Sequence, residues 1–296
     1  MALFQRKTSA RRRVVVCLSD LHSGHKLGLA NPDTILWDED QEGNPKARPI
    51  SLGATQEYLW ALYQEHIEGV TEFAAGDEIV VLHNGDLTQG THYPDQVASN
   101  ELDDQIQTGL WNLKPWFALP NVKTVRLLLG TGVHTLNGSS ELIIARLLRS
   151  EYGDRSVKAI SHGLFDIDGA LFDVAHHGAN ASSRVWLQGN QLRYYLRSLM
   201  LEELLAGNRP PDVVLRSHFH HWLPPETVSV GAGGKVYTSR MMLTSSYCGM
   251  GGHARKATRS QHVQNHGLVA IEIIGGEVCR VKPFVKTLDL RTKETL

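Results

Sequence analysis

Five runs of apolar, largely β-branched residues recur along the chain, and each run ends in a polar turn. They occupy 13–24, 77–90, 122–135, 170–180 and 211–221. Continuous apolar runs of this length are typical of strands that are buried on both faces of a sheet. The strand within each run terminates in His, Asp, Asn or Gly. The pattern therefore predicts buried strands that carry polar residues at their carboxyl ends.

Between these runs, apolar residues recur at the spacing of a helix. The stripes are Leu59, Leu62, Tyr63 and Ile67, then Ile143, Ile144, Leu147 and Leu148, and finally Leu192, Tyr195, Leu196 and Leu199. Residues at this spacing line one face of a helix, so the stripes predict three helices that pack on the core.

The remaining segments complete the expected architecture. "LFDIDGALFDV" predicts a hairpin that turns at Asp168-Gly169, and alternation from Val228 to Val285 predicts an antiparallel sheet. The segments between Gly24 and Thr55 and over 91–105 are expected to be loops that wall a cleft. The fold class that follows is α/β, with two mixed β-sheets packed face to face and flanking helices. Ligands in such folds lie beyond the carboxyl ends of the strands.

Composition adds limits to this interpretation. The chain has 296 residues, of which 42% are hydrophobic, and a formal net charge of −1. We expect a basic flexible tail over 1–12 and a single domain over 13–296, because no linker divides the chain. No apolar run is long enough to span a membrane, so no membrane partner is expected. The net charge gives no sign of nucleic-acid binding, although it does not exclude a basic groove at one place on the surface. The composition leaves the oligomeric state undetermined.

The cysteines indicate the compartment and exclude one kind of metal site. Cys17, Cys248 and Cys279 lie far apart and form no C-x-x-C pair. This spacing argues against both a zinc ribbon and a disulfide framework. A reduced, cytoplasmic environment fits best.

Polar side chains at the predicted strand ends have the character of metal ligands. They are Asp20, His22, Asn84, Asp86, His134, His176, His177, His218 and His220. In an extended strand, residues two apart point the same way, so His218 and His220 can act together. Oxygen and imidazole donors without thiolate suit Mn, Fe, Zn or Ni. The donors are too many for one ion, which favours two divalent transition-metal ions.

Four of these segments, taken in order, resemble the calcineurin-like metallophosphoesterases. "SDLHSG" resembles the D-x-H opening of that family, "NGDLTQ" its G-D segment, "AHHG" its isolated histidine, and "SHFH" its closing G-H-x-H with Ser for Gly. Each motif alone is weak, but four in order, each after an apolar strand, are specific. The resemblance covers 14 to about 222 and implies the αββα sandwich of that family.

The resemblance also implies a role for each matching residue. Asp20, His22 and His220 would hold the first metal, and Asp86 would bridge the two ions. His218 and one of His176 or His177 would hold the second. We prefer His176, the first imidazole after the strand, and expect His177 to contact substrate or to pack.

One motif departs from the family pattern. The family carries G-N-H-D/E after its third strand, with the Asn on the second metal, whereas this chain has "GTGVHTLNG" at 130–138. Either His134 keeps the phosphate-facing catalytic role on a longer loop, or it replaces the missing Asn as a ligand. Thr131, Asn137 and Asn84 are other donors within reach of the metals or the substrate.

The resemblance implies a metal-dependent phosphoester hydrolase, and we favour a phosphodiesterase with Mn bound. A hydroxide that bridges the metals is the expected nucleophile, with Asp86 and His134 as catalytic residues. A nuclease, a phosphomonoesterase or protein phosphatase, and a non-enzymatic binding scaffold are the alternatives. Compact chains of this type also occur in phage and bacterial genomes.

Overall fold

The computed structural model describes residues 11–136, 139–179, 184, 187–251 and 262–295. Within them, four helices cover the sheets. The helices are α1 (Ala54–Ala74), α2 (Leu102–Ala118), α3 (Ser139–Glu151) and α4 (Asn190–Leu205). No helix in this part of the chain is long and apolar enough to cross a membrane.

The larger sheet has six strands. In spatial order they are β13 (Glu277–Asp289), β12 (Val263–Ile274), β1 (Arg12–Leu18), β4 (Glu78–Asn84), β5 (Val122–Leu128) and β6 (Ser156–Ile160). Strands β1, β4, β5 and β6 run parallel, while β12 and β13 are antiparallel to their neighbours. The parallel strands therefore end at one edge of the sheet.

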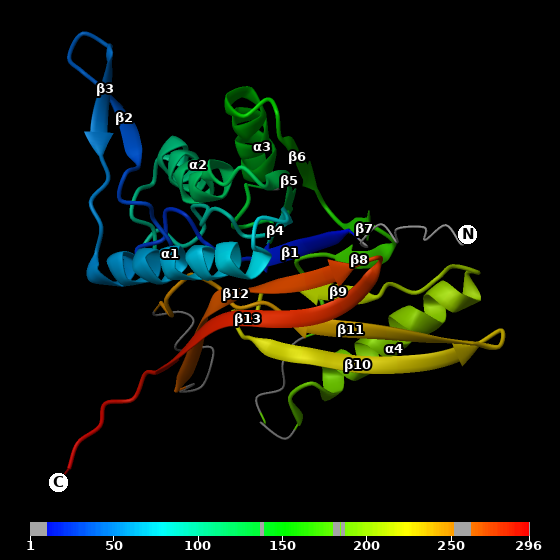
Figure 1. The fold of residues 1–296 in the computed structure, drawn as a ribbon. Helices are drawn as coiled ribbons and strands as arrows, with labels where there is room; N and C mark the ends of the chain where they lie inside the picture. The colour runs from blue at the N-terminus through cyan, green and yellow to red at the C-terminus, as the bar shows by residue number, and fades with distance from the viewer. Residues whose placement is uncertain (1–10, 137–138, 180–183, 185–186, 252–261, 296) are drawn as a thin grey trace.

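The smaller sheet has five strands. In spatial order they are β10 (Leu223–Ala232), β11 (Lys235–Leu243), β9 (Val213–Arg216), β8 (Ala170–Val174) and β7 (Gly163–Ile167). Here β8, β9 and β11 run parallel. A separate hairpin of β2 (Ile35–Glu39) and β3 (Pro45–Pro49) joins neither sheet; it projects from the molecule and contacts α2 through Arg48 and Asp104 (Figure 1).

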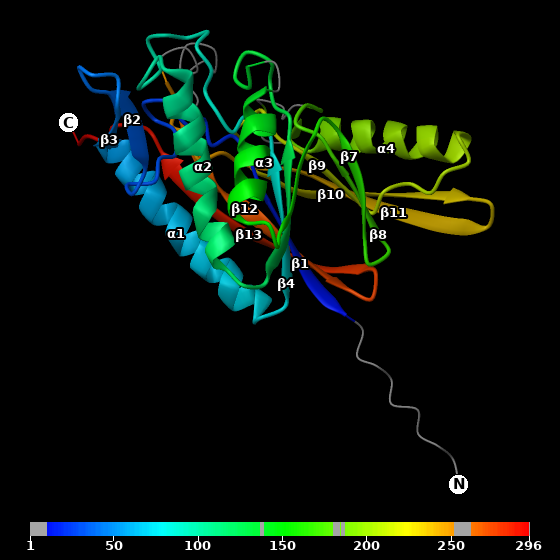
Figure 2. The ribbon, with the colours of Figure 1, turned by 90° about the horizontal axis from the view of Figure 1, so that it is seen from above.

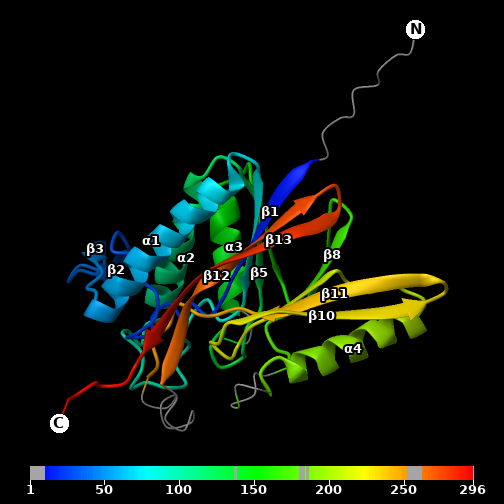
Figure 3. The same ribbon diagram turned by 60° about the horizontal axis from the view of Figure 1, so that its bottom comes forward.

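The two sheets share one hydrophobic layer. Val15 and Leu82 of the larger sheet lie in the same buried cluster as Phe172 and Leu215 of the smaller sheet. The opposite face of the larger sheet packs on α1, α2 and α3, and α4 covers the outer face of the smaller sheet. Figure 3 shows α1 to α3 on one side of the strands and α4 on the other, and Figure 2 shows the same division from above. The predicted α/β class is confirmed.

The strand prediction agrees with the structure except at its margins. All five apolar runs contain a strand, and the hairpin of β7 and β8 turns at Asp168-Gly169 as predicted. Arg12, which was assigned to the basic tail, instead begins β1, and residues 1–10 lie outside the described part. The tail after Val228 was predicted as one antiparallel sheet, which is wrong. Its two hairpins join different sheets.

The helix prediction found three helices and missed one. The stripes at 59–67, 143–148 and 192–199 fall in α1, α3 and α4, although Leu147 is 37% exposed rather than buried. The segment 91–105 was predicted as loop, but α2 begins at Leu102. The segment between Gly24 and Thr55 contains the β2–β3 hairpin.

Candidate metal centre

The predicted ligands follow the carboxyl ends of four parallel strands. Asp20 follows β1, Asp86 follows β4, His176 follows β8, and His218 follows β9. The prediction that His218 and His220 share one face of an extended strand is wrong, because β9 ends at Arg216 and both histidines have left-handed φ angles. Backbone hydrogen bonds fasten the first two loops together, because the Asp20 N–H donates to the Gly85 carbonyl and the His22 N–H to the Asp86 carbonyl. The two sheets therefore deliver donors to one place.

The backbone at these ligands is in a conformation that few residues adopt. Left-handed φ angles occur at Asp20 (54°), His22 (45°), Asp86 (53°), His218 (77°) and His220 (52°). Only three other non-glycine residues of the described chain have positive φ. Each such residue costs about 1–3 kcal/mol and persists where the surroundings over-determine it, which is common at functional sites.

A first cluster combines Asp20, His22 and His220, whose ligand atoms lie within 4.8 Å of one another. The Asp20 Oδ1 atom is 3.3 Å from His220 Nε2 and 3.8 Å from His22 Nε2. His22 Nδ1 lies 2.9 Å from the side-chain oxygen of Gln89, an acceptor that orients the ring. The second nitrogen of His22 therefore faces the carboxylate.

A second cluster combines His176, His177 and His218, again with ligand atoms within 4.8 Å. His176 Nδ1 donates to the Asn84 carbonyl at 2.6 Å, because a carbonyl only accepts. Burial and neighbouring His176 lower the pKa of His218 to about 4 and also lower the pKa of His177. Both rings are thus neutral at pH 7, the form in which imidazole binds metal.

Asp86 joins the two clusters. Its Oδ2 atom lies 3.0 Å from His176 Nε2, and Asp20, Asp86 and His176 form a third group with ligand atoms within 4.8 Å. Burial alone would raise the pKa of Asp86, but His176 lowers it to about 2. Burial would lower the pKa of His176, but Asp20 and Asp86 raise it to about 9. A positive charge at this junction is therefore strongly favoured.

The arrangement of lone pairs fits a bound cation. Asp20 Oδ1 is buried and accepts no hydrogen bond from the described residues. His22 Nε2 and His220 Nε2 are only 3.0 Å apart. Since His22 carries its proton on Nδ1, its Nε2 lone pair can accept a hydrogen bond from a protonated His220 Nε2 or bind a cation. These buried clusters can hold a metal ion.

Two further predicted donors, His134 and Asn84, belong to none of the ligand groups of the described residues. His134 Nδ1 donates to the Gln89 carbonyl at 2.8 Å, and its ring lies perpendicular to His22 at 4.7 Å between centroids. His134 therefore lies beside the first cluster. Asn84 donates to the Ala175 carbonyl and Ser217 Oγ, so it supports the loops below the ligands. Asn137 lies outside the described residues.

Two further residues lie beside the clusters, of which the sequence indicated only Thr131. Thr131 lies among the ligands, and its Oγ1 is 3.1 Å from Asp86 Oδ2 and 3.2 Å from His218 Nδ1. Its N–H also donates to Asp86 Oδ1 at 2.6 Å. Gln89 was not predicted at all, although its position three residues after Asp86 was the available signal.

Comparison with known proteins leaves the chain without a family. No model of a known protein family matches it, and no curated protein matches it. Among solved structures, it is similar to "the protein of unknown function AQ665 from Aquifex aeolicus", with a TM-score of 0.33 and 16% sequence identity. The match covers 71% of this chain and 80% of that one. So weak a likeness carries no argument about function.

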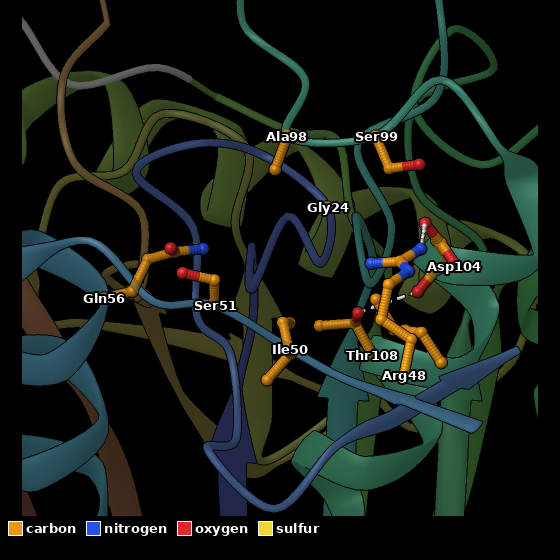
Figure 4. A pocket seen from close by; sticks show the side chains of 10 residues that line it. Gly24, Arg48, Ile50, Ser51, Gln56, Ala98, Ser99, Asp104 and Thr108 are labelled. Carbon is orange, nitrogen blue, oxygen red and sulfur yellow. Dashed lines mark hydrogen bonds and ion pairs between the residues drawn. The ribbon is translucent and has the colours of Figure 1, made fainter. Parts of the chain in front are cut away.

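A cavity of about 160 Å³ with a mixed polar and apolar lining lies between the β2–β3 hairpin and α2 (Figure 4). Its lining includes Gly24, Ser99 and Arg48, and it contains none of the predicted ligands. The Arg48 guanidinium is neutralised by Asp38 at 2.9 Å and Asp104 at 3.0 Å. The segments between Gly24 and Thr55 and over 91–105, which were expected to wall a cleft, do meet at this cavity. The cavity offers no unpaired positive charge to an anion.

A buried ion pair underlies the second cluster. Arg216, the last residue of β9, is fully buried, and its Nη2 lies 2.5 Å from Asp173 Oδ1 of β8. Its aliphatic stem presses on Gly178, where an added Cβ would meet Cγ at 2.5 Å. The pair therefore ties the loop that carries His176 to the loop that carries His218.

Proposed function

We propose that this chain is a metal-dependent phosphoester hydrolase of the calcineurin-like type, with two divalent cations and a preference for phosphodiesters. The observation that supports the proposal is the pair of acid and imidazole clusters joined through Asp86. The donors come from the four motifs of that family, in the same order. Two sheets that share a buried layer, with helices on their outer faces, also support the proposal of an αββα sandwich.

The first cation would bind Asp20, His22 and His220, and the second would bind His176 and His218, with Asp86 between them. Mn, Fe, Zn or Ni fits these ligands, since no thiolate is present, and we favour Mn. Bound cations would make hydroxide available from water near neutral pH and would neutralise phosphate charge. The protein orients the ligands through Gln89 and the Asn84 carbonyl.

His134 is the residue we assign to the substrate. Its Nδ1–H is held by the Gln89 carbonyl, so Nε2 is the atom that remains for a phosphoryl or leaving-group oxygen. Burial and neighbouring His22 lower the pKa of His134. The ring is therefore held in one orientation at the edge of the first cluster.

A diester agrees with the charge around the site. Among the described residues, the hydrogen bonds and ion pairs of the six proposed ligands involve histidine, carboxylate, amide, hydroxyl and backbone groups, with no lysine or arginine. A diester carries one negative charge and needs less compensation than a monoester dianion.

Two arginines that a nuclease could use to bind nucleic acid are already paired with carboxylates. Arg216 is buried against Asp173, and Arg193 pairs with Glu226 at 2.8 Å. A nuclease needs a track of basic side chains that are available to phosphate. We therefore place a small diester ahead of nucleic acid as the substrate.

The test of the proposal is metal-dependent hydrolysis by the full chain. Chelation should abolish hydrolysis of bis(p-nitrophenyl) phosphate, and Mn²⁺ should restore it more strongly than Ca²⁺, because imidazole suits the former. Turnover of p-nitrophenyl phosphate should be slower. Full activity in excess chelator, with no metal found by elemental analysis, would refute the proposal. A stable chain that binds no metal and hydrolyses neither ester would favour the scaffold.

Asp86→Asn tests the bridging carboxylate. The change should lower kcat by roughly 100-fold or more, since losing several kcal/mol of charge stabilisation has that effect. Folding should be kept, because Asn also tolerates left-handed φ. Asp154→Asn, at a side chain that is 67% exposed, is the matched control and should hydrolyse normally. Near-normal turnover in Asp86→Asn would remove Asp86 from the site.

A further inference from the structure

The second of the two adjacent histidines, His177, reaches the same space as the proposed ligands of the second cation. We propose that His177 is itself a ligand of that cation, in place of the Asn that the resembled family carries after its third strand. The inference rests on the proposed function, because it names a ligand of the same centre. The sequence-based prediction was that only one of the adjacent histidines, preferably His176, binds the second cation; here both bind it.

Three imidazoles surround this position. His177 forms a group with His176 and His218 in which all ligand atoms lie within 4.8 Å of one another. The ring centroid of His177 is 4.9 Å from that of His176 and 4.6 Å from that of His218. With one oxygen of Asp86, which is 3.0 Å from His176 Nε2, these rings supply four donors. Four donors of this kind satisfy a divalent transition metal.

Thr131 occupies the place in the sequence where the family has its Asn, directly after Gly130. Its Oγ1 lies 3.1 Å from Asp86 Oδ2, 3.2 Å from His218 Nδ1 and 3.4 Å from His177 Nε2. The shorter threonine side chain thus ends among the ligands without supplying an amide oxygen. His177 Nε2 enters the same space from the opposite loop.

His134 does not compete for this position. Its ring packs beside His22, and it belongs to no three-residue ligand group among the described residues. Its Nδ1 is engaged by the Gln89 carbonyl. Of the two imidazoles that could replace the missing amide, only His177 lies with the second cluster.

The experiment counts the ions bound to the full chain. Metal-free wild type and His177→Ala are titrated with Mn²⁺, and binding is followed by calorimetry and by elemental analysis after gel filtration. Wild type should bind two ions per chain. In His177→Ala, the affinity for one ion should fall at least about tenfold, while the other stays unchanged. His134→Ala is the matched control and should still bind two ions.

A second variant separates ligation from a structural role. Thr131→Asn, added to His177→Ala, supplies an amide oxygen after Gly130 and should restore the second ion. Rescue by a residue on a different loop is expected only if His177 acts as a donor. Restored binding of two ions in the double variant would also show that loss of the His177 side chain does not unfold the protein.

The outcomes distinguish this inference from the proposed function. Two ions in wild type and unchanged binding in His177→Ala would overturn the inference and leave the proposed function standing. A wild type that binds one ion would also overturn it, because no second site would exist. A wild type that binds no ion would remove the proposed function, and the ligand role of His177 with it.

Discussion

At the scale of single residues, the site depends on close approaches that only glycine permits. A Cβ at Gly130 would lie 2.1 Å from Asp86 Oδ1 and 2.2 Å from the Asp86 nitrogen. At Gly85 it would lie 2.4 Å from His176 Nδ1. These two glycines allow the loops after β4 and β5 to touch, and Asp86 is the residue between them.

Gly130→Ala should therefore disturb both stability and metal binding. The methyl group cannot fit without moving Asp86, so the free energy of unfolding should fall by about 2 kcal/mol or more. Urea denaturation measures this change, and Mn²⁺ titration measures the affinity. Gly231→Ala is the matched control, because its nearest neighbour atom would be 4.0 Å away. If both variants behave alike, the close approach does not matter.

The sequence identified six of the proposed ligands but not how the second cluster is completed. Asp20, His22, Asp86 and the two histidines of "SHFH" follow apolar strands, so their location could be predicted from the pattern. The convergence of His177 and Thr131 could not, because it depends on how two loops of different sheets fold back. Contacts of that kind leave no periodic signal in the sequence.

At the scale of secondary-structure elements, α2 shows where hydrophobic periodicity fails. Its buried face includes polar residues that serve the loops of the site. Gln105 bonds the backbone of Gly90, Asn112 bonds Ser23 Oγ and the Leu29 carbonyl, and Asp104 pairs with Arg48. Pro115 lies inside the helix as well. The apolar stripe is therefore interrupted wherever the helix supports the site.

Helix α3 carries a buried carboxyl group that should make stability depend on pH. Burial raises the pKa of Glu141 to about 7, although Ser140 Oγ and the Leu87 N–H donate to it and oppose the rise. The negative charge of Asp86 raises it further. The folded protein thus holds this proton more tightly than the unfolded chain. Stability should be lost as pH rises from about 4.5 through about 7.

Glu141→Gln removes this titration. Relative to wild type, the variant should gain a few kcal/mol between pH 5 and pH 8.5, since each pKa unit corresponds to about 1.4 kcal/mol. Urea denaturation at both pH values, with chelator present, measures the difference. Glu294→Gln, at an exposed residue, is the control. A constant difference between wild type and Glu141→Gln across this range would contradict the assignment.

At the scale of the whole molecule, the two sheets share a core and should unfold together. Phe172 of β8 is fully buried in the layer between them. Phe172→Ala should lower the free energy of unfolding by about 3–5 kcal/mol, because it leaves a cavity. A single transition should remain, with circular dichroism and tryptophan fluorescence changing at the same urea concentration.

The control for this variant is Leu164→Ala, at a side chain that is 60% exposed, which should change stability little. Two separate transitions in wild type would show that the sheets form independent units, contrary to the single domain expected over 13–296. The sequence predicted the two-sheet class from its strands. It did not predict which sheet each C-terminal hairpin joins, because that pairing links residues far apart in the chain.

The left-handed backbone at five of the proposed ligands limits how the site can be transplanted. A designer who copies only the Asp and His side chains onto an ordinary helix or strand would reproduce the donors but not the directions in which they point. The transferable unit is each strand end together with its loop, including Gly85 and Gly130. Libraries that randomise those loops should keep the ligands with left-handed φ angles and the two glycines unchanged, and should vary the exposed neighbours instead.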